Sequence, residues 1–424
     1  MEEKIASLRK YNFWDGEVPE LGFLRKFYTD KIFQYTGNKL VKVLVGQRRV
    51  GKSYILRQIA HKLIGQGVSP QNIFYVNKEF TDFDFVKNYN DLELLLNAYR
   101  KELAPEGKIY LFIDEIQNIE AWEYFVNSHA QDFVDKCEIF ISGSNSKMLS
   151  GELATLLSGR YVNFEIQPFS FAEYAEITNK DLSKQTCLDY MESGGLPELF
   201  VLPTEDTKKN YIAAIKDTVL LRDVIQRHNI KDPKLLEDIF VYLVNNASNL
   251  ISIINVVNFF KSNNRKTTYD TVSNYIGFIE DTFLVHKVER YDIKGKDTIS
   301  GVCKYYINDL SFKNFLYSGF GYGMGYKLEN MIYLELRRAR YKVYIGTMRD
   351  KEIDFVAKKG DRVIYLQSTY SLADEQTARR EYAPLESIAD NYEKWIVSMD
   401  DIVLPSNNGI RHIQAWNFGN VITT

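Results

Sequence analysis

The feature that most constrains the fold of this 424-residue chain is the stretch GQRRVGKS, Gly46–Ser53, which matches the pattern G-x-x-x-x-G-K-[ST] in full. It follows the apolar run Val41–Val45 and precedes SYILRQIAHKLIGQG, whose apolar residues recur on one face of a helix. A strand, a glycine-rich turn and a helix in this order gather backbone N–H groups and the positive helix end at one point. The pattern therefore predicts a phosphate-binding turn inside an α/β fold.

Each part of this pattern has a physical role. The glycines let backbone amides approach phosphate oxygens without interference from a Cβ atom. Lys52 is expected to reach the β- and γ-phosphates of ATP, and Ser53 is expected to bind Mg²⁺. The alternative is a glycine turn beside a surface lysine. The residues predicted to contact the nucleotide are Gly46, Gln47, Arg48, Arg49, Val50, Gly51, Lys52, Ser53 and Tyr54.

A second apolar run, Ile109–Ile113, ends in the acidic pair Asp114 and Glu115. Parallel strands bring their C-terminal residues to one edge of the sheet, so we expect both carboxylates near the phosphates. Asp114 is expected to hold Mg²⁺ through water. Glu115 is expected to orient and deprotonate the attacking water. The prediction is hydrolysis of ATP, with Lys52 and Glu115 as catalytic residues.

Changes in hydrophobic pattern divide the chain into five predicted segments. These are an N-terminal helical arm (1–40), an ATPase core (41–170), a helical lid (171–231), a winged-helix-like segment (232–300) and an α/β C-terminal domain (301–424). In the core, short apolar runs predict buried parallel strands at Val41–Val45, Ile73–Asn77, Ile109–Ile113, Glu138–Ser142 and Tyr161–Ile166.

The first 230 residues resemble the AAA superfamily of P-loop ATPases, in the branch related to archaeal-type and signal-transduction NTPases. GQRRVGKS, KIYLFIDEIQ and CEIFISGSNSKML carry the resemblance. It implies a sensor of the γ-phosphate at Ser144 or Asn145. It also implies an arginine finger at Arg160, before the strand YVNFEI, and hence a homo-oligomer, since a finger acts on a neighbouring subunit's nucleotide. A helix C-terminal cation is the other interpretation of Arg160.

Two short stretches have a structural and a functional interpretation. GGLPE, Gly194–Glu198, is similar to a Gly-Gly-x-Pro motif of the same branch, which implies packing near the adenine. A break between helices explains the stretch almost equally well. RRARYK, Arg337–Lys342, is the strongest local basic patch, and a solvated helix face is favoured over a grip on nucleic acid.

A winged helix at 232–300 raises the question of DNA. The candidate recognition helix, TYDTVSNYIGFIED, has three acidic residues and no basic one, which suits a phosphate-lined groove poorly. The hairpin that follows has Lys287, Arg290, Lys294 and Lys296 interleaved with Glu289, Asp292 and Asp297. A module for packing or for contact with a protein partner is favoured, and weak contact with DNA is the alternative.

In the C-terminal segment, Glu329 lies near the start of a helix, Asp354 on a strand, and Gln367 on the next strand. The order Glu, Asp, (Glu or Gln)-x-Lys resembles the restriction-endonuclease-like fold, which implies a tentative second metal site at Glu329, Asp354 and Gln367. Thr369 stands where that pattern has its lysine. The segment also looks like a domain of unknown function often fused to these ATPases.

The predicted fold class is therefore α/β, with a P-loop ATPase parallel sheet and helical lid, then a winged helix, then an endonuclease-like domain. Because of Thr369, that last domain is expected to be catalytically silent and to serve interaction or regulation. One alternative is an ATP-gated DNA nuclease of defence or mobile-element control. Another is an ATP-switched binding scaffold without enzymatic activity.

Composition limits the remaining classes. The net charge of −3 supplies no global positive field for nucleic acid. Three distant cysteines favour a reducing, cytoplasmic setting over a disulfide framework, and the five histidines show no zinc-ligand spacing. The start lacks the apolar stretch of a secretory signal, and no apolar run approaches the roughly 20 residues that span a bilayer.

Overall fold

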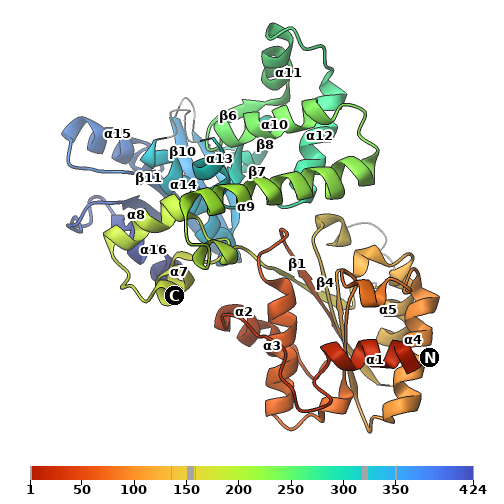
Figure 1. Ribbon diagram of the computed structural model, residues 1–424. Helices are drawn as coiled ribbons and strands as arrows, with labels where there is room; N and C mark the ends of the chain where they lie inside the picture. Colours follow the sequence, from red (N-terminus) through yellow and green to blue (C-terminus); the bar gives the residue numbers. More distant parts are fainter. Residues whose placement is uncertain are drawn as a thin grey trace. The chain divides into compact units, whose positions relative to one another are not determined.

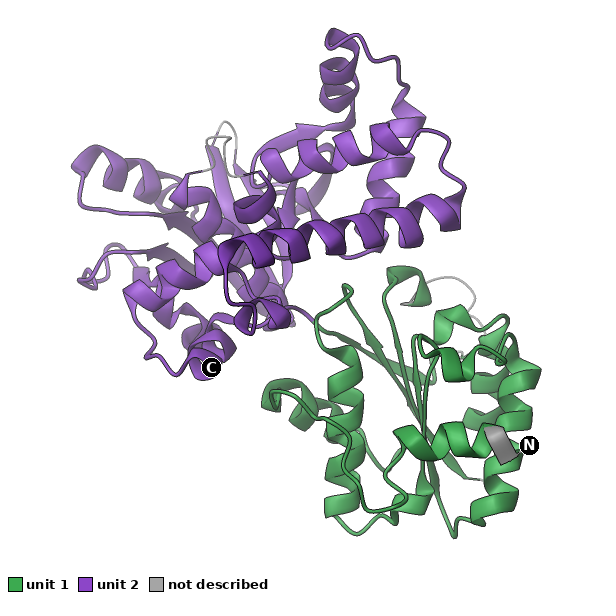
Figure 2. Ribbon diagram, in the orientation of Figure 1, with its two compact units in different colours: residues 1–166 green, residues 167–424 purple. Residues whose placement is uncertain are grey.

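The computed structural model describes residues 2–134, 136–149, 157, 159–317, 323–348 and 351–423. They fall into two compact units, residues 1–166 and 167–424 (Figure 2). The first unit contains a five-stranded sheet and the second an eight-stranded sheet.

Unit 1 is built on a parallel sheet with the strand order β2-β3-β4-β1-β5 (Figure 1). All five strands coincide, within a residue at each end, with strands predicted from the sequence, because short apolar runs suit strands buried on both faces. The predicted α/β fold with a parallel ATPase sheet is confirmed. The strands are β1 (Val41–Val45), β2 (Ile73–Asn77), β3 (Ile109–Asp114), β4 (Cys137–Gly143) and β5 (Tyr161–Glu165).

The longer helices that connect these strands are α3 (Lys52–Gly65), α4 (Tyr89–Leu103) and α5 (Trp122–Gln131). The predicted apolar stripe of α3 is buried from Ile55 to Leu63, and Ile64 is partly exposed. Short 3-10 turns complete the connections: η1 (Pro70–Asn72), η2 (Thr81–Phe83), η3 (Ile116–Asn118) and η4 (Ser146–Leu149).

The N-terminal arm, which includes α1 (Glu2–Tyr11) and α2 (Lys26–Phe33), is more deeply packed than its polar sequence suggests. Asn12 donates to the carbonyl oxygen of Tyr75 (3.0 Å) and accepts from the Tyr75 amide (2.8 Å). Trp14 Nε1 donates to the carbonyl oxygen of Ile73 (2.8 Å). These bonds satisfy backbone groups on β2, which is an edge strand of the sheet.

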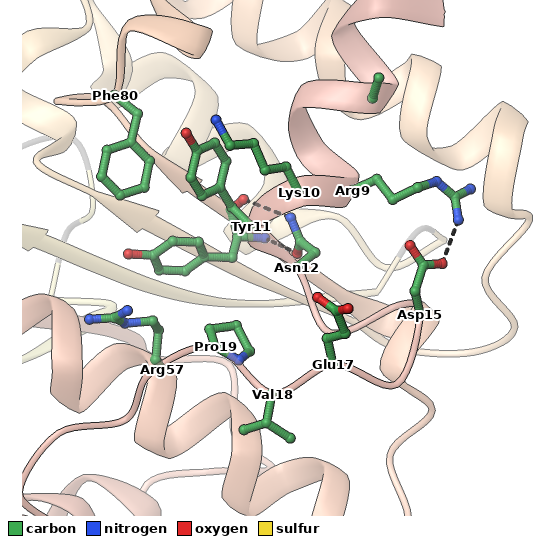
Figure 3. Close-up of a pocket in the computed structure, with 12 residues that line it drawn as sticks. Arg9, Lys10, Tyr11, Asn12, Asp15, Glu17, Val18, Pro19, Arg57 and Phe80 are labelled. Atoms are coloured by element: carbon green, nitrogen blue, oxygen red, sulfur yellow. Dashed lines mark hydrogen bonds and ion pairs between the residues drawn. The ribbon is translucent and has the colours of Figure 1, made fainter.

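A cavity of about 430 Å³ lies between this arm, α3 and β2 (Figure 3). Its charged lining groups are largely paired: Arg9 bonds Asp15 at 2.6 Å, and Lys10 bonds Asp82 at 2.9 Å. Tyr75 lines the cavity as well, and its hydroxyl reaches the acidic end of β3.

Unit 2 begins with helices and continues with a mixed sheet of strand order β13-β12-β11-β10-β9-β7-β8-β6. The first helices are α7 (Phe171–Thr178), α8 (Lys184–Ser193), η5 (Pro197–Phe200), α9 (Glu205–Thr218), the π-helix η6 (Val219–Gln226) and α10 (Pro233–Asn245). The strands are β6 (Leu250–Ser252), β7 (Val285–Asp292), β8 (Asp297–Ile307), β9 (Lys342–Met348), β10 (Lys351–Lys359), β11 (Arg362–Thr369), β12 (Glu393–Ser398) and β13 (Ile410–Gln414).

The remaining helices of unit 2 are α11 (Ile253–Ser262), α12 (Tyr269–Asp281), α13 (Ser311–Leu316), α14 (Met324–Arg338), α15 (Glu375–Glu386), η7 (Ala415–Asn417) and α16 (Phe418–Thr423). The helices and hairpin expected at 232–300 are α10, α11, α12 and β7–β8. Strand β7 also pairs in parallel with β9, and the boundary expected at residue 300 falls inside β8. One sheet therefore runs through both predicted segments.

Candidate functional site

The phosphate-loop residues Gly46–Ser53 lie between the C-terminal end of β1 and the first turn of α3. Gly46 and Gly51 have φ angles of 150° and 93°, a region that favours glycine. A Cβ atom at Gly46 would collide with the carbonyl group of Ile166, whereas a Cβ at Gly51 would meet no described atom within 4 Å. The glycines thus allow a tight turn with open space beside the start of α3.

Lys52 folds back over this turn. Its Nζ donates to the carbonyl oxygens of Gly46 (3.0 Å) and Gln47 (3.1 Å), and it lies 3.6 Å from Oε1 of Glu115. The side chain is buried. Lys52 is thus a buried ammonium group that is held by main-chain oxygens and lies beside open space. Such a group fits a site in which a bound anion balances its positive charge.

The other predicted loop residues contribute in different ways. Gln47 and Val50 are buried, and the Val50 carbonyl accepts from Nη1 of Arg25 in the N-terminal arm (3.0 Å). Arg48 pairs with Glu79 at 2.6 Å, Arg49 is exposed, and the Tyr54 ring packs against Arg57. The arm therefore supports the loop, a role that its sequence did not indicate.

Asp114 ends β3 and is fully buried. Its Oδ1 accepts from Ser142, and its Oδ2 accepts from Tyr75 (3.1 Å) and Asn77 (2.9 Å). The side chain of Ser53 is close enough to this carboxylate to lower its pKa, so the two predicted Mg²⁺ residues lie near each other. Burial and the neighbouring charge of Glu115 raise the pKa of Asp114, and a metal cation would favour its ionised form.

Glu115 follows with a left-handed backbone (φ 53°) that turns its side chain toward the loop. Its Oε2 accepts from Gln117 Nε2 at 2.6 Å, and its amide donates to Ser142 Oγ at 3.2 Å. Burial opposes ionisation, but the charges of Lys52 and Arg48 and hydrogen bonds from Gln117 and Ser144 hold the pKa of Glu115 below its ordinary value. Glu115 is thus a carboxylate near neutral pH.

The two sensor candidates differ in their surroundings. Ser144 hydrogen-bonds Glu115 and lies 3.4 Å from Gln117 Nε2. The side-chain oxygen of Asn145 accepts from the amide of Lys147 (2.7 Å), which fixes the following turn. Ser144 is therefore the candidate that belongs to the acidic cluster.

Sequence analysis missed Tyr75, Asn77, Gln117 and Ser142 in this cluster. Asn77, Asp114 and Ser142 lie at or next to the C-terminal ends of the adjacent strands β2, β3 and β4. Polar residues in that position meet at one edge of a parallel sheet, and this signal could have identified Asn77 and Ser142.

Arg160 is exposed and directly precedes β5. It therefore lies at the end of the sheet opposite the C-terminal ends of β1 and β3. Its carbonyl accepts from the Val41 amide (2.9 Å). The helix expected before it falls on 150–156 and 158, outside the described residues. The structure does not place Arg160 beside the phosphate loop of its own subunit.

The residues of the tentative second metal site, Glu329, Asp354 and Gln367, all lie in unit 2. Glu329 on α14 accepts from Lys304 Nζ (2.9 Å) and Tyr306 (2.7 Å). Lys304 also pairs with Glu352 at 2.8 Å. Burial, opposed by Lys304, raises the pKa of Glu329 to about 7.

Asp354 and Gln367, from the adjacent strands β10 and β11, are also bonded within the chain. Asp354 Oδ2 accepts from the amide and hydroxyl of Ser368 (2.8 Å each). Gln367 accepts from the Asp354 amide (2.7 Å) and donates to Glu381 (3.2 Å). The Thr369 hydroxyl bonds the carbonyl of Ser371 (3.4 Å). Over the described ranges, no three His, Cys, Asp or Glu side chains are arranged as a metal-binding group.

Two further stretches have structural roles. Helix α8 ends at Ser193, Gly194 has a φ of 77°, and the Gly195 amide donates to buried Asp309 (2.7 Å), which matches the interpretation of GGLPE as a helix break. In RRARYK, Arg338 pairs with Glu335 (2.8 Å) and bonds the carbonyl of Pro168 (2.9 Å). Arg338 therefore serves packing within unit 2 instead of forming a free basic surface.

None of the helices in the described part of the chain has the length and apolar character to cross a membrane.

Comparison with known proteins identifies the domain that contains the cluster. A family model described as "AAA domain" matches residues 38–175, and one described as "Domain of unknown function (DUF8612)" matches residues 184–321. Among solved structures, Aeropyrum pernix ORC1 in complex with DNA is 13% identical with a TM-score of 0.35, over 74% of this chain and 96% of that chain. AMPPCP-bound DnaA from Aquifex aeolicus is 15% identical with a TM-score of 0.31, over 64% and 91%. TM-scores this low support no conclusion about this chain.

Two sequence relatives extend over most of the chain. An uncharacterized protein of Haemophilus influenzae is 34% identical over 378 residues, which is 88% of this chain and 92% of that protein. The uncharacterized protein MJ1544 of Methanocaldococcus jannaschii is 31% identical over 373 residues, 82% of this chain and 79% of that protein. The chain therefore belongs to the family of these two relatives, and its N-terminal part is an AAA domain.

Proposed function

We propose that this protein binds and hydrolyses ATP with Mg²⁺ at the acidic cluster of unit 1. The observation that carries the proposal is the convergence of Lys52, Ser53 and the Asp114–Glu115 pair. Lys52 lies 3.6 Å from Glu115, and the side chain of Ser53 is close enough to Asp114 to lower the pKa of its carboxylate. Ser53 and Asp114 would hold Mg²⁺, which would neutralise charge on the β- and γ-phosphates.

In this proposal Lys52 leaves the loop carbonyls for the phosphates, and Glu115 becomes the general base for water. The lowered pKa of Glu115 keeps it able to accept a proton near neutral pH. Ser144 takes the role of γ-phosphate sensor because it lies within the acidic cluster, 3.4 Å from the Gln117 Nε2 that bonds Glu115. The attacking water gives its proton to Glu115, its oxygen bonds the γ-phosphorus, and ADP leaves with the electrons of the broken bond.

Arg160 completes the site from a neighbouring subunit in this proposal, which requires a homo-oligomer. Its exposure, and its place at the sheet edge opposite its own loop, support action across a subunit boundary. A guanidinium group at that boundary would stabilise charge in the transition state of the neighbour's reaction.

Nucleotide titration tests the binding step. Wild-type protein is expected to bind Mg-ATP, and Lys52→Ala is expected to lose measurable binding. Lys62→Ala is a matched control because Lys62 lies near the other end of the same helix, where it pairs with Asp30 in a partly exposed bridge and lies over the Phe33 ring. Equal affinities in wild type and Lys52→Ala would reject the phosphate-loop assignment.

For the C-terminal part we propose an endonuclease-like domain that is catalytically silent. The order α14–β9–β10–β11–α15–β12, with β9 to β11 antiparallel and β12 parallel to β11, supports the fold. Two observations support the lack of catalytic activity. Glu329 is already bonded to Lys304 and Tyr306, and Asp354 to Ser368. In addition, Thr369 stands in place of a lysine. The role of the domain would be interaction or regulation.

One observation favours a second candidate, an ATP-gated nuclease. Lys304 supplies a cation 2.9 Å from Glu329, which is the charge that Thr369 lacks. Incubation of plasmid DNA with Mg²⁺ or Mn²⁺ separates the two candidates. Cleavage by wild type that is lost in both Asp354→Ala and Lys304→Met would establish the nuclease. Undamaged plasmid in every reaction is the result that the silent domain predicts.

For residues 232–300 we propose a winged helix. The order of the elements, which is helix, strand, two helices and hairpin, supports this proposal. The exposed residues on α12 include Tyr269, Asp270 and Asn274, none of them basic. Within the hairpin, Arg290 bonds Thr347 (3.1 Å) and Lys287 approaches Glu289 (3.4 Å). We therefore propose contact with a protein partner, controlled by nucleotide state, ahead of contact with DNA.

A further inference from the structure

Gln117 is part of the acidic cluster, and the proposed hydrolysis so far gives it no role. It lies in η3, two residues after Glu115, and its Nε2 donates to Oε2 of Glu115 at 2.6 Å. The same nitrogen lies 3.4 Å from Ser144 Oγ. An amide nitrogen carries two hydrogens, so one side chain can bond both the base and the sensor.

The surroundings of Gln117 show that its amide is placed for these contacts. Strand β4 leaves room for it at Gly143, where a Cβ atom would lie 2.5 Å from Oε1 of Gln117. That Oε1 is buried and has no hydrogen-bond partner in the described part of the chain. A buried amide oxygen without a hydrogen-bond partner lowers the free energy of unfolding, so the contacts of Oε1 do not explain why the side chain takes this position. The hydrogen bond from Nε2 to Glu115 explains it.

We propose that Gln117 is a positioning residue that holds Oε2 of Glu115 fixed while Oε1 exchanges Lys52 for the attacking water. This inference rests on the proposed function. Lys52 lies 3.6 Å from Oε1, and a bound phosphate would draw it away. Gln117 and Ser144 then remain as partners of the carboxylate, because neither belongs to the phosphate loop.

A neutral amide suits this task better than a cation. It orients the carboxylate through one hydrogen bond, and it leaves the second oxygen able to accept the proton of water. Removal of the Gln117 amide should therefore leave the carboxylate of Glu115 less well oriented and lower kcat without weakening the binding of nucleotide.

The test compares Gln117→Ala with Asn118→Ala, a control in the same turn whose Nδ2 bonds no described residue. We expect Gln117→Ala to lower kcat by about 10- to 100-fold with Mg-ATP affinity unchanged. The control should match wild type in both measurements. An unchanged kcat in Gln117→Ala, or an affinity that falls together with kcat, would overturn the proposal.

A second measurement separates this inference from the proposed function. If the wild type releases no phosphate, the proposed function fails, and the contact is judged from Tm values of Gln117→Ala, Glu115→Ala and the double variant. If the two side chains bond each other, the loss of Tm in the double variant should differ from the sum of the losses in the two single variants. Additive losses would show that Gln117 does not hold Glu115, whatever the reaction.

Discussion

Lys52 Nζ lies 3.6 Å from Oε1 of Glu115, so the cation of the phosphate loop and the acid that follows β3 neutralise each other. Both are buried, and their attraction is therefore less screened by solvent than that of a surface pair. A triphosphate that took Lys52 would leave Glu115 charged beside it. In the proposed reaction, binding of the nucleotide and release of Glu115 to act as the base would thus be coupled through one contact.

Glu115→Gln separates binding from turnover. The variant keeps the phosphate loop and Lys52, so Mg-ATP should bind with nearly wild-type affinity. Loss of the base should slow phosphate release by at least about 100-fold. Parallel titration and steady-state kinetics measure the two effects, and wild-type turnover in this variant would remove Glu115 from the mechanism.

Arg160→Ala tests the arginine finger. Because Arg160 is exposed, the variant should fold normally, while turnover falls by about 10³-fold if the guanidinium stabilises a neighbour's transition state. Lys101→Ala, another exposed cation of unit 1, is the control and should turn over like wild type. Normal turnover in Arg160→Ala would leave the residue a structural role only.

Lys304→Met tests the buried charge cluster of unit 2. It leaves Glu329 and Glu352 without their shared cation, and removing one partner of a buried pair costs about 3–5 kcal/mol of unfolding free energy. The double variant Lys304→Met, Glu329→Leu should recover part of that loss. Denaturant unfolding measures both. A loss below about 1 kcal/mol in the single variant would contradict the cluster's structural role.

Glu280→Gln gives a pH-dependent prediction. Burial, with Lys287 opposing, raises the pKa of Glu280 from 4.5 to about 7. The folded state therefore binds more protons than the unfolded state between these values, and its stability falls as pH rises from 4.5 to 7. At pH 8 the variant should be more stable than wild type by about 1–3 kcal/mol, and at pH 4 the difference should vanish.

The control for that prediction is Glu198→Gln, which changes an exposed glutamate in η5. It should follow the wild-type curve of unfolding free energy against pH. Equal curves for wild type and Glu280→Gln would show that Glu280 is ionised in the folded state throughout this range.

Local patterns predicted most of unit 1. The five strands are short apolar runs, and the phosphate loop and acidic pair are contiguous motifs, so the sequence alone indicates them. Tyr75 was missed because its contact with Asp114 depends on the spatial pairing of β2 with β3, whereas Ser142 could have been identified at its strand end and Gln117 lies only two residues after Glu115. The arm was predicted to be polar, but Asn12 and Trp14 are buried by hydrogen bonds to a strand edge.

In the C-terminal part, the sequence showed a motif but not a residue from outside the motif that contacts it. Glu329, Asp354 and Gln367 were recognised by their order, and the structure draws them together. Lys304 was not recognised, because it lies on β8, outside the stretch that carries the motif, and only the fold brings it to Glu329. A motif defined by spacing cannot show a residue contributed from elsewhere in the chain.

Phosphate release from Mg-ATP by purified wild-type protein, with an EDTA control, tests the central claim most directly. The amides, lysine and carboxylates gathered at the end of the parallel sheet predict release with Mg²⁺ and none once the metal is chelated. A protein that neither releases phosphate nor binds nucleotide at millimolar Mg-ATP would contradict the account.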